Sequence, residues 1–213
     1  LYDSAMPRSM VKAVRELLNL KKPELVAGGR YHHFSDLMKL PVSGRPELRV
    51  KPLPPAAHPG FDSNRDPFGT LRRHDVLLHF PYHDFDNVVK LVQKAARDPL
   101  VRRLSITLYR VAEDSRICEA LIEAMGRGKK VLVFVEVQAR FDERSNLYWG
   151  EALEKAGAHV IYSYEHLKVH CKLLLIERKD GRGTKRYAYL GTGNFNERTS
   201  RIYTDMGLLT AHE

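Results

Sequence analysis

Strand and helix patterns alternate from about residue 75 onward, and this alternation restricts the possible folds more than any other feature of the sequence. Short apolar runs typical of strands lie at 75–80, 103–111, 130–137 and 158–164. The stretches between them repeat apolar residues at helical spacing, at 84–98, 115–128 and 146–157. Strands that alternate with helices over short connections form a largely parallel sheet with helices on both sides. The sequence therefore predicts an α/β domain, in which the strand at 130–137 is apolar enough to be buried on both faces.

Segments outside this alternation predict three additions. Residues 172–193 contain two strand patterns joined by a Gly-rich turn, which predicts an antiparallel hairpin near the C-terminus. Apolar residues from Met10 to Leu18 recur at helical spacing and predict one amphipathic helix. Seven prolines without periodicity at 41–69 predict an extended linker or loop. Because the chain begins without methionine, we also expect it to have been cut from something larger.

The charge balance favours an anionic partner. The 213 residues include 35 Lys and Arg against 26 Asp and Glu, which gives a net charge of +9 and a pI near 9.6. Nucleic acid and polyphosphate are natural partners of such a chain, although an ordinary solvated surface with a basic bias has the same composition. No run of about 18 apolar residues occurs, so we predict a globular protein without a transmembrane segment, by default cytoplasmic. Cys118 and Cys171 fit no metal spacing and are predicted to be small core residues.

Residues 166–177 read HLKVHCKLLLIE and contain two overlapping His-x-Lys pairs. Alternate side chains of a strand face the same side, so either pair would place an imidazole beside an ammonium. His170 and Lys172 lead directly into the apolar run LLLI, which would fix their backbone, whereas His166 and Lys168 lie before it. We therefore predict that His170 and Lys172 form the functional pair. Residue type alone says little, because the chain has ten histidines.

Arginines follow two of the predicted strands. Arg110 follows SITLY, and Arg140 follows KVLVFVEVQ. In such sheets, function collects beyond the carboxyl ends of the strands, and two guanidiniums there suit the oxygens of a phosphate. Each arginine alone would also fit a surface ion pair, with Glu113 or Glu143 as its partner.

The stretch GTGNFNERTS follows the predicted hairpin. Gly191 and Gly193 would let the backbone turn sharply with its N–H groups exposed to an anion, although such a turn before a helix is also a common connection. The H-x-K pair, the apolar strand and a G-x-x-N turn that ends at Asn194 together resemble half of a phospholipase D-type active site, in which a histidine attacks phosphorus. Glu177 stands where that family usually has aspartate, Gly-Thr replaces Gly-Ser, and the sequence holds one copy of the motif instead of two.

A closer resemblance extends over nearly the whole chain. Bacterial polyphosphate kinases, which extend inorganic polyphosphate from ATP, are similar in the segments GGRYHHFSDLMKLP, DVLLHFPYHDFDNVV, TLYRVAEDSRI, VEVQARFDERSNLYWGEALEKAGAHVIYS, LKVHCKLLLIERK and YLGTGNFNERTSRIYTDMGLLTA. The resemblance implies a phospholipase D-like catalytic domain at 57–213, the first of two in that family. It also implies that 1–56 is the remnant of a helical domain followed by the Pro-rich linker.

The same resemblance assigns roles to single residues. His170 matches the autophosphorylated histidine, and Lys172 matches its neighbour in the pair. Arg110 and Arg140 match arginines of a magnesium and phosphate site. Because a guanidinium has no lone pair to give a hard cation, these arginines would bind phosphate around Mg²⁺ and not Mg²⁺ itself. Tyr203 matches a tyrosine that contacts the nucleotide.

The implied reaction is reversible transfer of the ATP γ-phosphate to polyphosphate through a phosphohistidine. Mg²⁺ would be the cofactor, ATP, ADP and polyphosphate the partners, with no specific nucleic acid. The resemblance also implies a cytoplasmic homo-oligomer, with peripheral membrane association left open. Because the family site uses other domains, including a second histidine, we expect this chain alone to lack robust kinase activity. Two alternatives remain: a phospholipase D-type phosphodiesterase with water as acceptor, and a non-catalytic polyanion-binding module.

Overall fold

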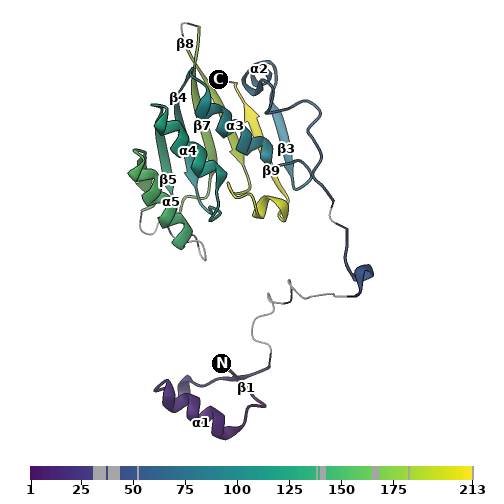
Figure 1. Cartoon of the computed structure of the whole chain (residues 1–213), viewed down its shortest axis with the longest axis vertical. Coiled ribbons are helices and arrows are strands. Elements are labelled where there is room, and N and C mark those ends of the chain that lie inside the picture. Colours follow the sequence, from purple (N-terminus) through teal and green to yellow (C-terminus); the bar gives the residue numbers. More distant parts are fainter. Residues whose placement is uncertain are drawn as a thin grey trace. The chain divides into compact units, whose positions relative to one another are not determined.

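The computed structural model describes residues 1–30, 37, 44–51, 53–137, 139, 143–164, 168–181 and 183–212. The chain divides into two compact units, Leu1–Pro52 and Leu53–Glu213. Both are drawn in Figure 1.

The first unit is small, and its described residues contain one α-helix. α1 (Arg8–Leu17) confirms the amphipathic helix that the apolar spacing predicts. Arg30 Nε lies 3.3 Å from Asp3 Oδ2, and this ion pair connects the segment after β2 to β1. The remaining elements are β1 (Tyr2–Asp3), η1 (Lys22–Glu24), β2 (Ala27–Gly28) and η3 (Pro46–Leu48). β1 and β2 pair in parallel.

The second unit is an α/β fold around one seven-stranded sheet, with the strand order β3-β9-β8-β7-β4-β5-β6. The strands are β3 (Val76–Phe80), β4 (Val101–Leu108), β5 (Lys130–Val135), β6 (His159–Tyr162), β7 (Lys172–Asp180), β8 (Gly183–Gly191) and β9 (Asp205–Thr210). The helices are α2 (Pro67–Arg73), α3 (Asp86–Arg97), α4 (Arg116–Gly126) and α5 (Glu143–Lys155), with the short 3-10 turn η4 (Thr199–Arg201). The predicted fold class is thereby confirmed. No helix in the described ranges is long and apolar enough to cross a membrane.

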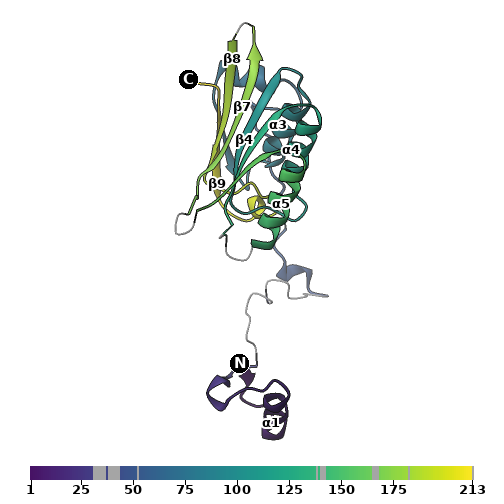
Figure 2. The ribbon, with the colours of Figure 1, turned by 90° about the vertical axis from the view of Figure 1, so that its left-hand side faces the viewer.

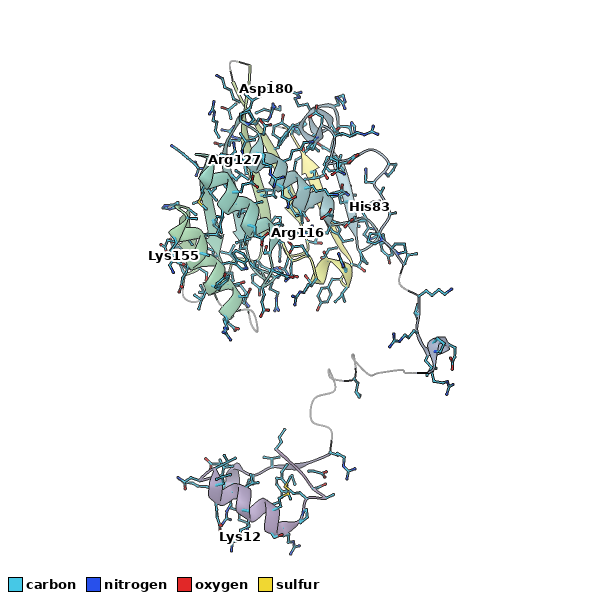
Figure 3. The ribbon with its side chains drawn as sticks, in the orientation of Figure 1. Lys12, His83, Arg116, Arg127, Lys155 and Asp180 are labelled. Carbon is cyan, nitrogen blue, oxygen red and sulfur yellow. The ribbon has the colours of Figure 1, made fainter. Side chains whose placement is uncertain are left out.

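Five of the seven strands run in one direction. β4, β5 and β6 pair in parallel, and the other four contacts between neighbours are antiparallel. β7 and β9 run against the rest, so a mostly parallel set of strands still has mainly antiparallel pairs. The predicted hairpin at 172–193 is confirmed as β7 and β8. Asp180 at its tip lies at the end of the sheet away from Arg116 (Figure 3).

The three long helices of this unit, α3, α4 and α5, lie on one face of the sheet (Figure 2). Phe68 of α2 packs on the same face, since its ring centroid lies 4.9 Å from that of Tyr187. Leu174 on this face is 1% exposed, whereas Leu173 on the opposite face is 41% exposed. The expectation of helices on both sides is therefore wrong for the described part of the chain.

The sequence predicted that the strand at 130–137 is buried on both faces, whereas β5 is buried on one face only. Val131, Val133 and Val135 are buried against the helices, while Leu132 and Phe134 between them are partly exposed. The continuous apolar run thus reflects apolar side chains on both faces of the sheet. Helices cover only one of these faces in the structure as described.

Helix α2 was missed by the sequence analysis, which assigned 41–69 to a loop because of its prolines. Pro67 occupies the first turn of α2, where its missing N–H removes no intrahelical hydrogen bond. Asp66 caps the helix, because its Oδ1 accepts the N–H of Gly69 at 2.9 Å. The predicted loop therefore extends three residues into a helix.

The two cysteines lie in different environments. Cys118 is buried in α4, as predicted, and burial raises the pKa of its thiol to about 12. Cys171 is exposed, so the prediction of a core residue is wrong there. The reason is its position immediately before β7, where the chain has not yet joined the sheet.

The side chain of Asn146 in α5 connects the ends of two central strands. It is fully buried, and its Nδ2 donates to the carbonyls of Tyr109 at 2.7 Å and Glu136 at 2.8 Å. Its Oδ1 accepts the N–H of Val111 at 3.2 Å. One amide therefore joins α5 to the chain beyond β4 and beyond β5.

We expect Asn146→Ala to lower the free energy of unfolding by about 3 kcal/mol, because two carbonyls and one N–H would stay buried without partners. Asn146→Asp should cost at least as much, since a carboxylate cannot donate to carbonyls. Urea unfolding of the chain measures both. Asn64→Ala is the matched control, because the exposed Asn64 side chain donates to Asp62 at the surface, and it should change stability by less than about 0.5 kcal/mol. Equal losses in the two alanine variants would contradict the role of Asn146.

Candidate active site

Three of the predicted site residues, Arg110, His170 and Lys172, lie at one end of the sheet. Lys172, the first residue of β7, pairs with Gly191 at the end of β8, and Gly191 pairs with Gly207 in β9. Because β7 and β9 run against the other strands, their first residues meet the carboxyl ends of β4, β5 and β8. Arg110 follows β4 at this end. The structure therefore places Arg110 at the same end of the sheet as the His170–Lys172 pair.

The segment that carries His170 lies beyond the strand ladder. β4 and β7 pair only as far as Leu174, and Thr107 of β4 continues the contact through its side chain. The Oγ1 of Thr107 donates to the carbonyl of Cys171 at 2.8 Å and accepts the N–H of Leu173 at 3.0 Å. One hydroxyl thus replaces two ladder hydrogen bonds directly after His170.

A buried carboxylate holds the chain on the other side of His170. Glu136 follows β5 and is 1% exposed, and its Oε2 accepts the N–H of Val169 at 2.9 Å. Its Oε1 accepts the hydroxyl of Ser163 at 2.9 Å, and the Ser163 oxygen accepts the N–H of Val137 at 3.1 Å. The backbone just before His170 is therefore fixed to the chain beyond β5 and β6.

His170 and Lys172 differ in exposure. His170 is exposed, whereas Lys172 is 3% exposed, and its Nζ donates to the His170 carbonyl at 2.6 Å. Partial removal from water, followed by the charges of Lys172, Lys168 and Arg110, lowers the pKa of His170. Burial also lowers the pKa of Lys172, and Arg110 adds to that effect, while the charge of Asp205 opposes it. A neutral imidazole is thus favoured beside fixed positive charge.

Tyr109 lies among these groups and was missed by the sequence analysis. It is 7% exposed, and its ring meets the His170 ring at 80°, with 4.7 Å between centroids. The cationic ends of Lys172, Arg110 and Lys168 lie 5.0, 5.7 and 5.8 Å from the centre of the same ring. Four of the site's side chains therefore contact one aromatic residue.

The glycines of the GTGN turn provide room for neighbouring side chains. Neither has the positive φ that favours glycine. A Cβ on Gly191 would lie 2.7 Å from the ring of Tyr189, and one on Gly193 would lie 2.5 Å from the carboxylate of Asp205. Close contact, not an unusual backbone, explains both glycines. Asn194 follows them, and its Oδ1 is buried without a hydrogen-bond partner among the residues that the structure describes.

Asp205 is a second residue of the site that sequence reasoning missed. It begins β9, and its Oδ1 accepts the hydroxyl of Thr192 at 2.8 Å. The Thr192 oxygen in turn accepts the N–H of Met206 at 2.9 Å. In the sequence, Asp205 is an acidic residue that precedes an apolar run. This pattern is too common to identify one carboxylate as functional.

Of the other predicted site residues, the structure describes only Tyr203 in addition to Asn194. Tyr203 is 60% exposed in the turn after η4, two residues before Asp205. Its backbone N–H donates to the carbonyl of Thr199 at 3.0 Å. Arg140 and His166 lie outside the described residues.

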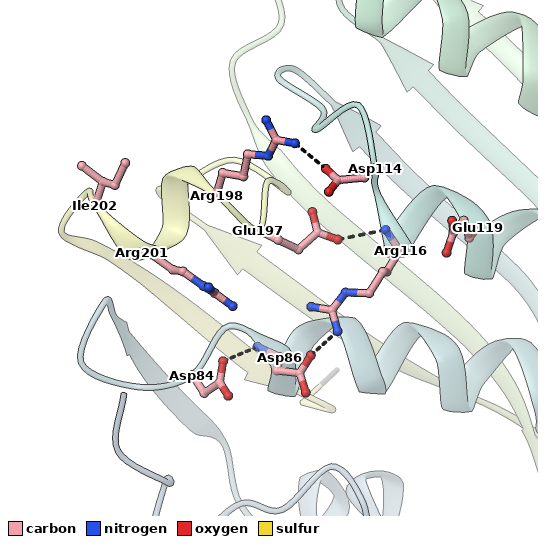
Figure 4. A pocket seen from close by; sticks show the side chains of 9 residues that line it. All are labelled: Asp84, Asp86, Asp114, Arg116, Glu119, Glu197, Arg198, Arg201 and Ile202. Atoms are coloured by element: carbon pink, nitrogen blue, oxygen red, sulfur yellow. Dashed lines mark hydrogen bonds and ion pairs between the residues drawn. The ribbon is translucent and has the colours of Figure 1, made fainter. Parts of the chain in front are cut away.

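A charged pocket of about 940 Å³ lies between the starts of α3 and α4 and the turn η4 (Figure 4). Arg116 pairs with Asp86 at 2.6 Å, and Arg198 pairs with Asp114 at 3.2 Å. Glu197 Oε1 accepts the backbone N–H of Arg116 at 3.0 Å, and burial raises the pKa of Glu197. Because carboxylates offset the charge of these two arginines, the pocket attracts anions only weakly.

The side chains around His170 do not suit direct metal ligation. Within the described ranges, no group of three or more His, Cys, Asp and Glu side chains is placed to hold a metal ion. Lys172 and Arg110 carry protonated nitrogens, which have no lone pair for a hard cation. A divalent cation would therefore reach this end of the sheet together with an anion that supplies its oxygen ligands.

Comparison with known proteins identifies the family. Residues 66–213 match the family model of polyphosphate kinase C-terminal domain 1. The polyphosphate kinases of Klebsiella pneumoniae and Escherichia coli (strain K12) are 50% and 48% identical to the chain over 212 and 214 residues, which is 99% of the chain and 31% of each relative. The crystal structure of polyphosphate kinase from Porphyromonas gingivalis is similar over 99% of the chain and 32% of that protein, with 38% identity and a TM-score of 0.77.

These matches cover both the sheet and its charged end. The family model includes every strand of the seven-stranded sheet and the segment with His170 and Lys172. The chain spans about a third of the length of the relatives it matches. The chain therefore belongs to the polyphosphate kinase family and contains its C-terminal domain 1.

Proposed function

We propose that this chain is part of a longer polyphosphate kinase, which transfers the ATP γ-phosphate reversibly to polyphosphate through a phosphohistidine at His170. The observation that carries the proposal is an imidazole with a lowered pKa beside the cationic side chains of Lys172, Lys168 and Arg110. A neutral imidazole is a nucleophile, and positive charge around it offsets the charge of an attacked phosphate. The family of residues 66–213 supports the choice of substrates.

In the first step, an unprotonated ring nitrogen of His170 attacks the γ-phosphorus of ATP and forms an N–P bond. The bond from that phosphorus to the β–γ bridging oxygen breaks, and ADP leaves with the electron pair. In the second step, a terminal oxygen of polyphosphate attacks the same phosphorus, and the N–P bond breaks to restore the imidazole. Polyphosphate is then longer by one phosphate, and the reverse sequence regenerates ATP.

The surrounding residues bind and orient the phosphates. Lys172, whose Nζ donates to the carbonyl of His170, holds positive charge beside the attacking ring. We assign the phosphate oxygens to Arg110, Arg140 and Asn194, because guanidinium groups and the Nδ2 of an amide can donate hydrogen bonds to them. Tyr203, exposed at the same end of the sheet, is assigned to the nucleotide.

Mg²⁺ enters this proposal as part of the substrate. It would neutralise phosphate charge in its complex with ATP. Arg110 and Arg140 would bind the phosphate oxygens of that complex without ligating the metal, because guanidinium nitrogens have no lone pair to offer.

The domain assignment follows the same proposal. Residues 57–213 would form the catalytic domain, and 1–56 the end of a helical domain with its linker. The relatives are about three times as long as this chain, so other domains would complete the site and the chain alone would lack robust kinase activity. We place the whole enzyme in the cytoplasm as a homo-oligomer.

Incubation of the full-length enzyme with γ-labelled ATP and Mg²⁺ should attach acid-labile label to His170. His170→Ala should abolish the label, because it removes the nucleophile. His166→Ala should keep it, because the first histidine of HLKVHCK has no part in the reaction. Acid lability and mass spectrometry of the labelled peptide identify the site.

Each other outcome of this experiment has a defined meaning. Label that persists in His170→Ala would contradict the phosphohistidine at this residue. Turnover of a chromogenic phosphodiester without ATP would indicate a phospholipase D-type hydrolase. Salt-sensitive polyphosphate binding without any label would indicate a polyanion-binding module. Synthesis by the chain alone at the rate of the full-length enzyme would contradict the need for other domains.

Lys172→Met should slow formation of the phosphoenzyme by about 10²-fold, because loss of one preorganised electrostatic group costs that order of magnitude. Rapid-quench measurement of a single turnover in the full-length enzyme gives the rate constant. Lys179→Met is the matched control in the same strand, about 23 Å along β7 from Lys172. Lys179 is exposed near the hairpin tip, so its replacement should leave the rate unchanged. Unchanged rates in both variants would contradict a role for Lys172.

Lys168→Met should move the acid limb of the pH dependence of phosphoenzyme formation to higher pH. The charge of Lys168 disfavours the imidazolium, so its removal raises the pKa of His170, and the neutral form is then lost at a higher pH as acid is added. The native enzyme should remain active below the ordinary histidine pKa of about 6.5. Lys179→Met should leave the limb in place. A move to lower pH in Lys168→Met would contradict the electrostatic cause.

A further inference from the structure

Tyr109 is more firmly held than the histidine that it contacts. Its carbonyl accepts the buried amide of Asn146 at 2.7 Å, and it directly follows the last residue of β4. His170 instead lies before β7, whose ladder pairs begin at Lys172 with β8 and at Leu174 with β4. The tyrosine ring is therefore a fixed surface at the end of the sheet, against which a side chain of a less regular segment is placed.

The contact between the two rings has a defined geometry. The planes meet at 80° with 4.7 Å between centroids, which is the edge-to-face arrangement that aromatic rings prefer. A side chain with two freely rotating bonds acquires one orientation from such a contact. The thermodynamic gain is small, but the direction of the attacking nitrogen depends on it.

The same ring also attracts the cations of the site. The ends of Lys172, Arg110 and Lys168 all lie within 5.8 Å of its centre. Cations near the face of an aromatic ring interact favourably with its negative quadrupole. Three cations at one place repel one another, so a ring that attracts each of them reduces the cost of gathering them before an anion binds.

We propose that Tyr109 is a positioning residue for phosphoryl transfer, whose ring orients the His170 imidazole and gathers the cations of Lys172, Lys168 and Arg110 around it. This inference rests on the proposed function of His170. It concerns the aromatic ring and not the hydroxyl, because each of the four contacts is made by the ring.

Three replacements of Tyr109 in the full-length enzyme separate the ring from its hydroxyl and from its electrostatics. Tyr109→Phe keeps the ring and should phosphorylate His170 within about threefold of the native rate. Tyr109→Leu removes the ring and should slow the step about 30- to 100-fold at saturating ATP, because a misplaced nucleophile loses rate and not substrate affinity. Replacement of Tyr109 by 3,4,5-trifluorophenylalanine keeps the shape but weakens the quadrupole, and should be slower than the phenylalanine variant.

Two further measurements distinguish positioning from general stability. The affinity for a non-hydrolysable ATP analogue should fall in Tyr109→Leu by a smaller factor than the rate of phosphorylation does. The acid limb of its pH profile should move to higher pH, because His170 would be more open to water. Tyr187→Leu is the matched control, since Tyr187 is another buried tyrosine on the helix-covered face, where it contacts Phe68. It should lower thermal stability and leave the rate per folded enzyme unchanged.

The inference would be overturned by a native rate and pH limb in Tyr109→Leu. Equal slowing by Tyr109→Leu and Tyr187→Leu would also overturn it, since both tyrosines would then act through stability. If Tyr109→Leu does not fold, the comparison of the phenylalanine and trifluorophenylalanine variants decides, and equal rates for these two would overturn the electrostatic part. Label that survives in His170→Ala would instead show that the proposed function is wrong, whatever the tyrosine variants do.

Discussion

The buried amide of Asn146 is the contact on which the geometry of the site depends. It forms hydrogen bonds with the carbonyls of Tyr109 and Glu136 and with the N–H of Val111. These three backbone groups lie in the interior, just beyond the ends of β4 and β5. A buried polar group without a partner costs about 1–3 kcal/mol, so Asn146 stabilises the turns that the chain makes beyond β4 and β5. The turn after β4 carries the ring of Tyr109, and the turn after β5 carries the carboxylate of Glu136. Both lie next to the segment with His170. A residue in a helix thus fixes the distance between two strand ends at the substrate side.

Side chains, and not a strand ladder, hold the segment around His170. Glu136 fixes the N–H of Val169, and Thr107 fixes the carbonyl of Cys171. A regular strand would have paired this backbone with β4 and set the side chains alternately above and below the sheet. The chain joins β8 at Lys172 and β4 only at Leu174, so Lys172 is buried in the sheet while His170, which lies before both contacts, is exposed. In the proposed reaction, the imidazole could then meet a substrate while its backbone is still defined on both sides.

The sequence predicts the parts of this arrangement that repeat, and it misses those that occur once. Apolar periodicity identified β3 to β8 and α3 to α5, because burial against one sheet imposes a regular spacing. His170, Lys172 and Arg110 could be named because strand ends collect function in such sheets. Thr107 and Glu136 could not, since each acts through hydrogen bonds to residues distant in sequence. The glycines were recognised, but their reason was not, because contact with Tyr189 and Asp205 is visible only in three dimensions.

The same electrostatic field has opposite consequences for the two members of the His-x-Lys pair. Burial and the charge of Arg110 lower the pKa of both His170 and Lys172. An ordinary lysine titrates near pH 10.4, well above neutrality, and the charge of Asp205 opposes the lowering at Lys172. An ordinary histidine titrates near 6.5, at the edge of neutrality, so the same direction of shift removes its proton. In the proposed reaction, this cluster of charge would therefore favour the neutral imidazole that attacks phosphorus, without a separate base to deprotonate it.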